Sequence, residues 1–317
     1  MKKMAKVVVG AGVAVLTVIV ILNHFDSQTI PKTVDRVSSI IGERNTLRLE
    51  EAGYGVINFL DEKRFAVKKD LGNQALAAPF VRKKPANFYE LTQARGDLDA
   101  IIDIAIIDLD QVDLHLVCGT RDPAKGSGII PVGDKDRLVM AFSGGFQYQH
   151  DRGGIAFDGH ALRPMKKNAG TLIVFQDGRV VIGKWGRDFT ELSPEMKYVR
   201  QCLLLVDKGK FNDQEPFDAY VLGRGVRVFR SALGITKGGK LVYAAGNKIS
   251  AKSLAEAMMA NGVISAICLD MNYGNATCGV ASHQKGKISI RPLTERFPDP
   301  RRFLGTNYRD FFYLTSS

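Results

Sequence analysis

The pattern of apolar and polar positions divides the chain into three parts. Residues 7–22 form an uninterrupted apolar run, and residues 26–87 mix charges with apolar positions at helical spacing. Residues 88–317 carry short apolar segments separated by turn residues. A run of about 16 apolar residues is at the short end of what spans a bilayer as a helix. We therefore predict a cytoplasmic N-terminus and membrane anchor at 1–25, a helical stalk at 26–87 and one folded domain at 88–317.

Charges around the apolar run predict the topology. Lys2, Lys3 and Lys6 precede it and no lysine follows it closely, which places the N-terminus in the cytoplasm. The residues after the run offer no pair of small residues for signal cleavage, so we expect an uncleaved single-pass anchor with the main domain outside the cytoplasm, in a periplasm or on the cell surface. Gly10 and Gly12 resemble a dinucleotide-binding loop, but apolar residues continue on every helical face, which excludes a Rossmann domain.

The folded domain shows mostly strand patterns and one clear helix. The segment 251–261 is predicted to be a helix, with Ser250 as its N-cap and Gly262 as its stop. Predicted strands, two pairs of them joined as hairpins, cover 101–109, 114–118, 138–142, 171–175, 179–183, 202–206, 230–235, 241–245 and 263–269. The fold class predicted is α+β, with mixed, mostly antiparallel sheets flanked by helices.

Charge and cysteine usage narrow the partners. The net charge of +11 favours anionic partners such as phosphate-bearing glycans or anionic lipid. No basic helix with interleaved aromatic residues is present, so the sequence does not indicate nucleic-acid binding. The four cysteines form no C-x-x-C pair and the histidines do not cluster with them, so we expect no metal site and no cofactor. Either all four cysteines are free and buried, or Cys268 and Cys278 form one disulfide. Cys268 and Asp270 lie two residues apart on a predicted strand, so we expect their side chains to point to the same face.

Three segments, taken in order, resemble the phosphodiester glycosidase family. The first is Ala141-Phe142-Ser143-Gly144-Gly145-Phe146, followed by Gly153-Gly154 and Phe157-Asp158-Gly159. The second is Arg230-Ser231-Ala232-Leu233-Gly234-Ile235. The third is the predicted helix, its following strand and Leu269-Asp270-Met271-Asn272. The resemblance runs from about residue 88 to residue 314, and it rests on the order and spacing of motifs that are each weak alone.

The sequence departs from the family pattern at two of these motifs. Ser143 stands where the family has asparagine, and Leu-Asp-Met-Asn replaces a glycine-rich Leu-Asp-Gly-Gly-Gly-Ser. The stretch Trp185-Gly186-Arg187-Asp188 is similar to a bacterial branch of the family that uses Leu-Asp-x-Asn. The second departure is therefore consistent with a subfamily.

The resemblance implies a reaction and a set of site residues. The family cleaves the bond between a sugar's anomeric carbon and a phosphate oxygen, which requires a cation for the phosphate and a carboxylate at the anomeric centre. Arg230 is the candidate for the phosphate, because a guanidinium fork suits two phosphate oxygens, and a surface salt bridge is the alternative. Asp270, at the end of an apolar strand, is the candidate carboxylate, and an acid that caps a loop is the alternative.

The remaining candidates are less specific. Ser143, Gly144 and Gly145 form a tight turn whose amides could face an anion, or a plain β-turn. Asp158 could be a second carboxylate, and its separation from Asp270 would decide an inverting or a retaining outcome, but Asp-Gly is also a common turn dipeptide. Asn272 and Arg152 are candidates for sugar hydroxyls and phosphate.

Three function classes remain open from the sequence. The first is a hydrolase that acts on a phosphate-linked glycan of the envelope or surface. The second is a binding module that has lost catalysis through the changes at Ser143 and Leu-Asp-Met-Asn. The third is a structural subunit of an envelope assembly. Turnover of a sugar-1-phosphodiester separates the first class from the others.

Overall fold

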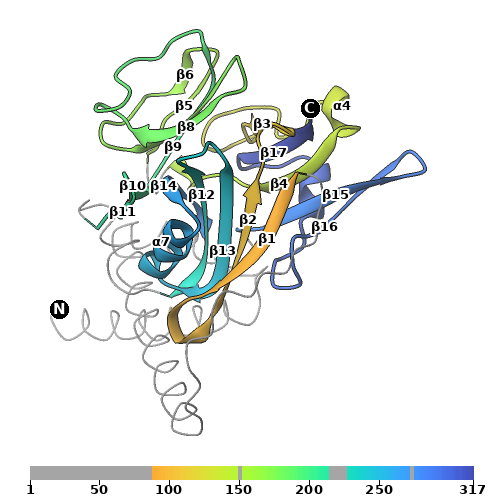
Figure 1. Cartoon of the computed structure of the whole chain (residues 1–317). Helices are drawn as coiled ribbons and strands as arrows, with labels where there is room; N and C mark the ends of the chain where they lie inside the picture. Colours follow the sequence, from red (N-terminus) through yellow and green to blue (C-terminus); the bar gives the residue numbers. More distant parts are fainter. Residues whose placement is uncertain (1–87, 149–151, 214–226, 272–274) are drawn as a thin grey trace, which may run out of the picture. The chain divides into compact units, whose positions relative to one another are not determined.

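The apolar segments of the folded domain build a large antiparallel sheet. The computed structural model of the chain describes residues 88–148, 152–213, 227–271 and 275–317 (Figure 1). The large sheet has seven strands, and every strand pair in it is antiparallel. Their spatial order is β1 (Tyr89–Arg95), β2 (Ile101–Ile107), β13 (Leu241–Ile249), β12 (Val228–Thr236), β14 (Val263–Met271), β10 (Leu204–Asp207) and β11 (Lys210–Phe211).

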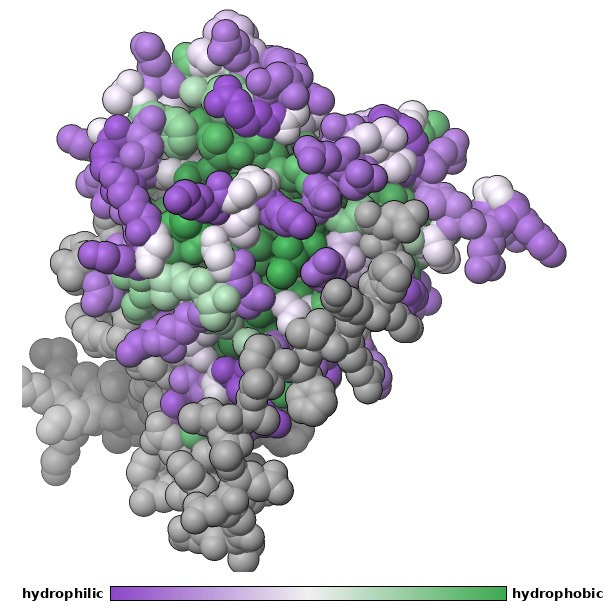
Figure 2. Space-filling model, viewed as in Figure 1, coloured by the Kyte–Doolittle hydropathy of each residue, from purple (hydrophilic) through white to green (hydrophobic). Residues whose placement is uncertain are grey.

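Two five-stranded antiparallel sheets complete the strand content of the described residues. The first has the order β16 (Lys287–Pro292), β15 (Cys278–Gln284), β4 (Leu138–Ser143), β17 (Phe311–Ser316) and β3 (Val112–Val117). The second has the order β6 (His160–Arg163), β5 (Ile155–Phe157), β9 (Met196–Cys202), β7 (Gly170–Phe175) and β8 (Val180–Lys184). The far end of the β15–β16 hairpin is exposed at residues 283–287 and forms a hydrophilic projection in Figure 2.

One regular helix, α7 (Ala251–Ala260), covers a face of the seven-stranded sheet (Figure 1). Its predicted N-cap is confirmed, because the Ser250 side chain accepts a hydrogen bond from the Ser253 amide at 3.1 Å. Gly262, which follows the helix, has a φ of 81°, a conformation that favours glycine. Leu254 and Met258 point inward and pack in a cluster that we call the helix-side core, which includes residues 232, 244, 266 and 268.

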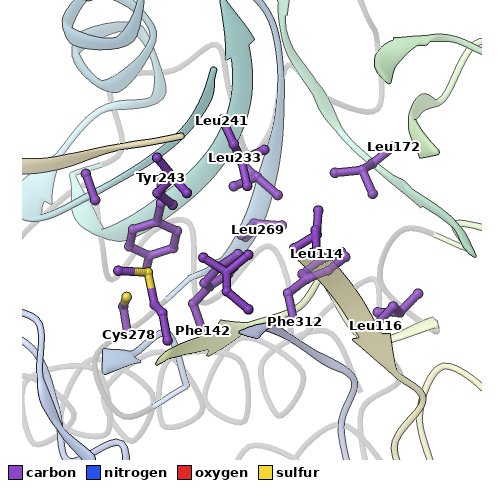
Figure 3. Close-up of a cluster of buried hydrophobic side chains, with 14 of the residues drawn as sticks. Leu114, Leu116, Phe142, Leu172, Leu233, Leu241, Tyr243, Leu269, Cys278 and Phe312 are labelled. Atoms are coloured by element: carbon purple, nitrogen blue, oxygen red, sulfur yellow. The ribbon is translucent and has the colours of Figure 1, made fainter. Parts of the chain in front are cut away.

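The opposite face of the large sheet packs against the other two sheets through a second cluster, which we call the inter-sheet core. It takes Leu233, Tyr243 and Leu269 from the large sheet, and Phe142 and Phe312 from the first five-stranded sheet (Figure 3). Alternating side chains of a strand point to opposite faces, so the strands β2, β13, β12 and β14 contribute to both clusters. Membership in one cluster or the other therefore indicates to which face of the large sheet a buried side chain points.

The fold confirms the antiparallel character of the sheets and corrects the prediction that helices flank them. In the described residues, α4 (Val132–Lys135) and the 3-10 helices η1 (Asp97–Asp99) and η2 (Arg301–Leu304) are single turns, which leaves α7 as the one helix that covers a sheet face. The opposite face of the large sheet is buried against the other two sheets. This packing follows from the alternating pattern of the strands, because each strand has an apolar face that can pack against a second sheet.

The membrane anchor and the stalk predicted at 1–25 and 26–87 lie outside the described residues. Within residues 88–317, the described part contains no helix that is long and apolar enough to cross a membrane.

Candidate functional site

Asp270 lies near the end of β14, the strand that follows α7 along the chain. Its side chain is buried, and a buried carboxylate is costly unless it is paired or hydrogen-bonded. Its backbone amide donates to Gly144 O at 2.8 Å, and its carbonyl accepts from Ser231 Oγ at 2.7 Å. The aspartate is therefore held directly between the turn that follows β4 and the middle of β12.

A β-bulge decides which way the Asp270 side chain points. The register of β14 against β12 shifts around Ser231, so that Leu269 and Asp270 both lie opposite that residue. Cys268 and Met271, on either side of this pair, both pack in the helix-side core, whereas residues three apart in a regular strand point to opposite faces. The extra residue turns Asp270 to the same face as Leu269, which packs in the inter-sheet core. The prediction that Cys268 and Asp270 share a face is therefore wrong.

Two arginines face the Asp270 carboxylate. Arg309 Nη1 lies 2.8 Å from Asp270 Oδ2, and Arg302 acts on the same carboxylate through its charge. Burial raises the pKa of Asp270 above its usual value, and the charges of Arg309 and Arg302 oppose this rise. Burial lowers the pKa of Arg309, but Asp270 outweighs it together with other anionic neighbours, so that the pKa of Arg309 is raised. The raised pKa of Asp270 reflects its removal from water, and the raised pKa of Arg309 reflects its ion pair with that carboxylate.

Ser143, at the end of β4, joins this cluster through its hydroxyl. Arg302 Nη2 donates to Ser143 Oγ at 2.7 Å and also to Asn275 O. The hydroxyl also accepts from the Thr277 amide at 2.9 Å and lies 2.8 Å from Asn275 O, to which it donates. The serine therefore orients one guanidinium of the site and fastens β4 to the segment that precedes β15.

Gly144 and Gly145 form a turn over a buried ion pair. Arg200 Nε donates to Asp310 Oδ2 at 2.8 Å, and the two side chains are 0% and 2% exposed. The Gly144 amide donates to Asp310 O at 3.2 Å, and the Gly145 amide donates to Asp310 Oδ2 at 3.2 Å. The sequence predicts either amides that face an anion or a plain β-turn here, and in the structure both amides donate to Asp310. A Cβ at Gly145 would lie 2.6 Å from Arg200 Nη2, so the glycine is needed for close packing.

Arg230 points away from the Asp270 carboxylate. Its neighbours in β12, Phe229 and Leu233, pack in the inter-sheet core, while Ala232 packs in the helix-side core. Alternation therefore places Arg230 on the helix face, where its Nε donates to Ile249 O at 3.1 Å. The structure brings Arg230 close to Asp270 in the sheet, but the two side chains belong to opposite faces.

Asp158 lies in the two-residue turn of the β5–β6 hairpin, as the alternative interpretation of Asp-Gly expected. Asp158 and Gly159 have φ values of 48° and 77°, which is typical of the type I′ turns of tight hairpins. The side chain is exposed and accepts a hydrogen bond from Gln176 Nε2 at 2.8 Å. Asp158 is exposed in a hairpin turn, whereas Asp270 is buried in β14, so the structure does not bring the two predicted carboxylates together.

The other predicted residues add little to this site. Arg152 is exposed, and its amide donates to Tyr148 O at 2.8 Å. Asn272 lies outside the described residues. In the part of the chain that the structure describes, no group of three or more histidine, cysteine, aspartate or glutamate side chains is arranged to hold a metal ion.

All four cysteines lie in described segments, and all four are free and buried. Cys268 packs in the helix-side core and Cys278 in the inter-sheet core, so the backbone of the large sheet separates their side chains. Of the two interpretations of the cysteines, the structure supports free thiols.

The Trp185-Gly186-Arg187-Asp188 stretch forms a clamp between two sheets. The Arg187 guanidinium donates to Asp207 at 2.7 and 2.8 Å, and to Asp188 at 2.9 and 2.6 Å. Asp207 ends β10 of the large sheet, whereas Arg187 follows β8 of the second five-stranded sheet. These hydrogen bonds raise the pKa of Arg187, so it is held as a cation between the two carboxylates. This similarity to the bacterial branch therefore marks a structural contact.

Sequence reasoning missed the basic residues that complete the site. Arg302 lies in η2, and Arg309 and Asp310 immediately precede β17, so all three come after Asp270 in the chain. Arg200 lies in the middle of β9 and carried no motif. The only available signal was the run of charged residues between 295 and 310, which reads as an ordinary solvated loop without the tertiary structure.

The comparison with family models supports the resemblance that the motifs predict. Residues 136–270 match the model of the phosphodiester glycosidase family. This segment is therefore similar to a phosphodiester glycosidase domain. The match begins before β4 and ends at Asp270, and it covers less than half of the chain. The resemblance predicted from the motifs is confirmed, and the phosphodiester glycosidases are hydrolases, which supports that class for this chain.

The similar solved structures have low sequence identity and low TM-scores. One match is the catalytic domain of zebrafish N-acetylglucosamine-1-phosphodiester alpha-N-acetylglucosaminidase, auto-inhibited by its pro-peptide. It is 17% identical with a TM-score of 0.45, and the match covers 76% of this chain and 88% of that one. A hypothetical protein from Synechocystis matches at 11% identity with a TM-score of 0.45, over 76% of this chain and 64% of that one. The search of curated proteins found no match.

Proposed function

We propose that this protein is a membrane-anchored, extracytoplasmic hydrolase that cleaves a sugar-1-phosphodiester, with Asp270 acting at the anomeric centre. The observation that carries the proposal is the position of Asp270. It is the last residue of the family match, it is buried, and it is paired with Arg309 beside a second arginine. A carboxylate held among cations and largely removed from water suits a transition state in which positive charge develops on a sugar and negative charge on a phosphate.

The chemistry needs one water and one broken bond. The bond between the anomeric carbon and the phosphate oxygen breaks, the electron pair leaves with the phosphate, and the water oxygen bonds to the anomeric carbon. The water's proton leaves through a base, and the products are a free sugar and a phosphomonoester. A carboxylate at Asp270 can stabilise the oxocarbenium-like centre or accept this proton.

The substrate phosphate needs a cation, and the sequence motif assigns it to Arg230. This assignment stays a prediction. The described contact of Arg230 lies on the helix face of the large sheet, whereas Asp270 faces the other way. Asp158 lies in an exposed turn and is not part of the proposed mechanism.

The location outside the cytoplasm is proposed from the sequence. The apolar run 7–22 preceded by Lys2, Lys3 and Lys6 favours an anchor with a cytoplasmic N-terminus. The net charge of +11 fits a phosphate-bearing glycan of the envelope or surface as the substrate. A reporter that works only outside the cytoplasm, fused after residue 75, should be active, and an inactive fusion would overturn this location.

Steady-state hydrolysis of a set of sugar-1-phosphodiesters tests the activity. Wild-type protein should release the free sugar, and Asp270→Asn should lower kcat by about 100-fold or more while ligand binding persists. Asp177→Asn, in an exposed turn, is the matched control and should retain wild-type kcat. Full activity in Asp270→Asn would refute the proposed role of this residue. Binding of phosphate-bearing glycans without turnover by the wild type would select the binding-module alternative.

A further inference from the structure

We propose that Arg302 and Arg309, rather than Arg230, form the site that binds the anionic phosphodiester group of the substrate. This proposal rests on the proposed function, because it names the phosphate-binding residues of that same site. It assigns the phosphate to residues that lie beyond the segment matched by the family model, which ends at residue 270.

The two arginines are held by contacts to the ends of two strands, β4 and β14. Arg302 is fixed by its hydrogen bond to Ser143 Oγ at 2.7 Å, at the end of β4. Arg309 is fixed by its ion pair with Asp270 at 2.8 Å, near the end of β14. The two strand ends are themselves joined, because the Asp270 amide donates to Gly144 O at 2.8 Å. Arg309 therefore contacts the Asp270 carboxylate directly, and Arg302 acts on it through its charge.

The electrostatics of this arrangement favours an added anion. Burial lowers the pKa of Arg302, and the like charge of Arg309 lowers it further. Asp270 opposes this effect with a single negative charge. Two like charges in a region of low dielectric constant attract an anion more strongly than they would in water. A phosphodiester, with one negative charge and two free oxygens, matches the planar donor fork of arginine.

Both arginines are partly exposed at the surface. The Arg309 side chain is 11% exposed, and its neighbour Tyr308 is 46% exposed. The nearby pair of Arg200 and Asp310 provides a contrast, because both of those side chains are almost fully enclosed. Arg200 is therefore suited to holding the turn in place, whereas Arg302 and Arg309 border the solvent.

Phosphate binding to the full chain in non-ionic detergent tests the proposal independently of turnover. Isothermal titration with inorganic phosphate should show saturable binding to the wild type. Arg302→Gln should weaken this binding by roughly 10-fold or more, the loss expected for a hydrogen bond to a charged group. Arg302→Lys should restore part of it, because lysine keeps the charge and loses the fork. Thermal unfolding of each variant checks that the protein remains folded.

Arg301→Gln is the matched control. Arg301 is the preceding residue, and it pairs with Asp299 in solvent, with side chains 79% and 52% exposed. Arg301→Gln removes one positive charge from η2, as Arg302→Gln does, and it should change the phosphate affinity less than twofold. Unchanged affinity in Arg302→Gln, a larger loss in Arg230→Gln, or no saturable phosphate binding by the wild type would each overturn the proposal.

Kinetics separate this proposal from the proposed function. If the wild type hydrolyses a sugar-1-phosphodiester, Arg302→Gln should raise KM, and a KM equal to that of the wild type would refute the binding role while leaving the hydrolase intact. If the wild type hydrolyses no phosphodiester but binds phosphate through Arg302, the anion site stands and the hydrolase is refuted.

Discussion

The guanidinium of Arg309 lies 2.8 Å from the carboxylate of Asp270, and the two residues come from strands of different sheets or their immediate flanks. Asp270 is near the end of β14 in the seven-stranded sheet, and Arg309 precedes β17 in a five-stranded sheet. The ion pair therefore links the two sheets at the point where the sequence motifs of the family also meet. A contact in this position can serve both stability and function.

Substitutions of Arg309 and Asp270 should have strongly non-additive effects on the free energy of unfolding. Arg309→Leu leaves the Asp270 carboxylate buried without its nearest cation, which should lower the free energy of unfolding by about 3–5 kcal/mol. The double variant Arg309→Leu and Asp270→Leu removes both charges and should recover a large part of that loss. Urea unfolding followed by the fluorescence of Trp185, the single tryptophan, measures both values. Additive losses in the double variant would show that the pair is not coupled.

The acidic limb of the pH–rate profile should report Asp270. Burial raises the pKa of this carboxyl while the charges of Arg309 and Arg302 lower it, so removing one of these charges raises it further. If the ionised carboxylate is the active form, Arg302→Met should move the acidic limb of kcat/KM to higher pH. Arg302→Lys keeps the charge and should leave the limb near that of the wild type. A limb that does not move in Arg302→Met would exclude Asp270 as its source.

The turn at Gly145 should tolerate no side chain. A Cβ there would meet Cys202 Sγ at 2.5 Å and Arg200 Nη2 at 2.6 Å, and neither buried group has room to shift. We expect Gly145→Ala to lower the free energy of unfolding by about 1–3 kcal/mol through overpacking. Gly133→Ala, in the single turn α4 where a Cβ meets nothing within 4 Å, is the control and should be neutral or slightly stabilising. Equal stability of the two variants would contradict the packing described for the turn.

The Arg187 clamp should contribute to stability and leave catalysis intact. Arg187 is 37% exposed, and its partners Asp188 and Asp207 are partly exposed, so solvent screens the interaction. Arg187→Ala should therefore lower the free energy of unfolding by only about 1 kcal/mol or less, with kcat and KM close to those of the wild type. A large loss of kcat with a normal melting temperature would place this motif in the active site instead.

The sequence by itself determined the elements whose pattern is local. The apolar run from Val263 and the N-cap at Ser250 specify β14 and α7, because strand alternation, capping and a glycine stop are set by near neighbours. The order of the motifs also made Asp270 a candidate site residue and gave the resemblance to the family, which the family-model match supports. These predictions needed no knowledge of which strand lies beside which.

Only the tertiary structure decided the composition of the site and the direction of its side chains. One extra residue in β14 turns Asp270 to the face opposite Arg230, and a shift of one residue inverts the facing of a strand without a clear mark in the sequence. Strand order then brings Arg302 and Arg309 from the end of the chain to Asp270. Contacts of this kind depend on register and packing between distant segments, and the sequence pattern of each segment alone does not specify them.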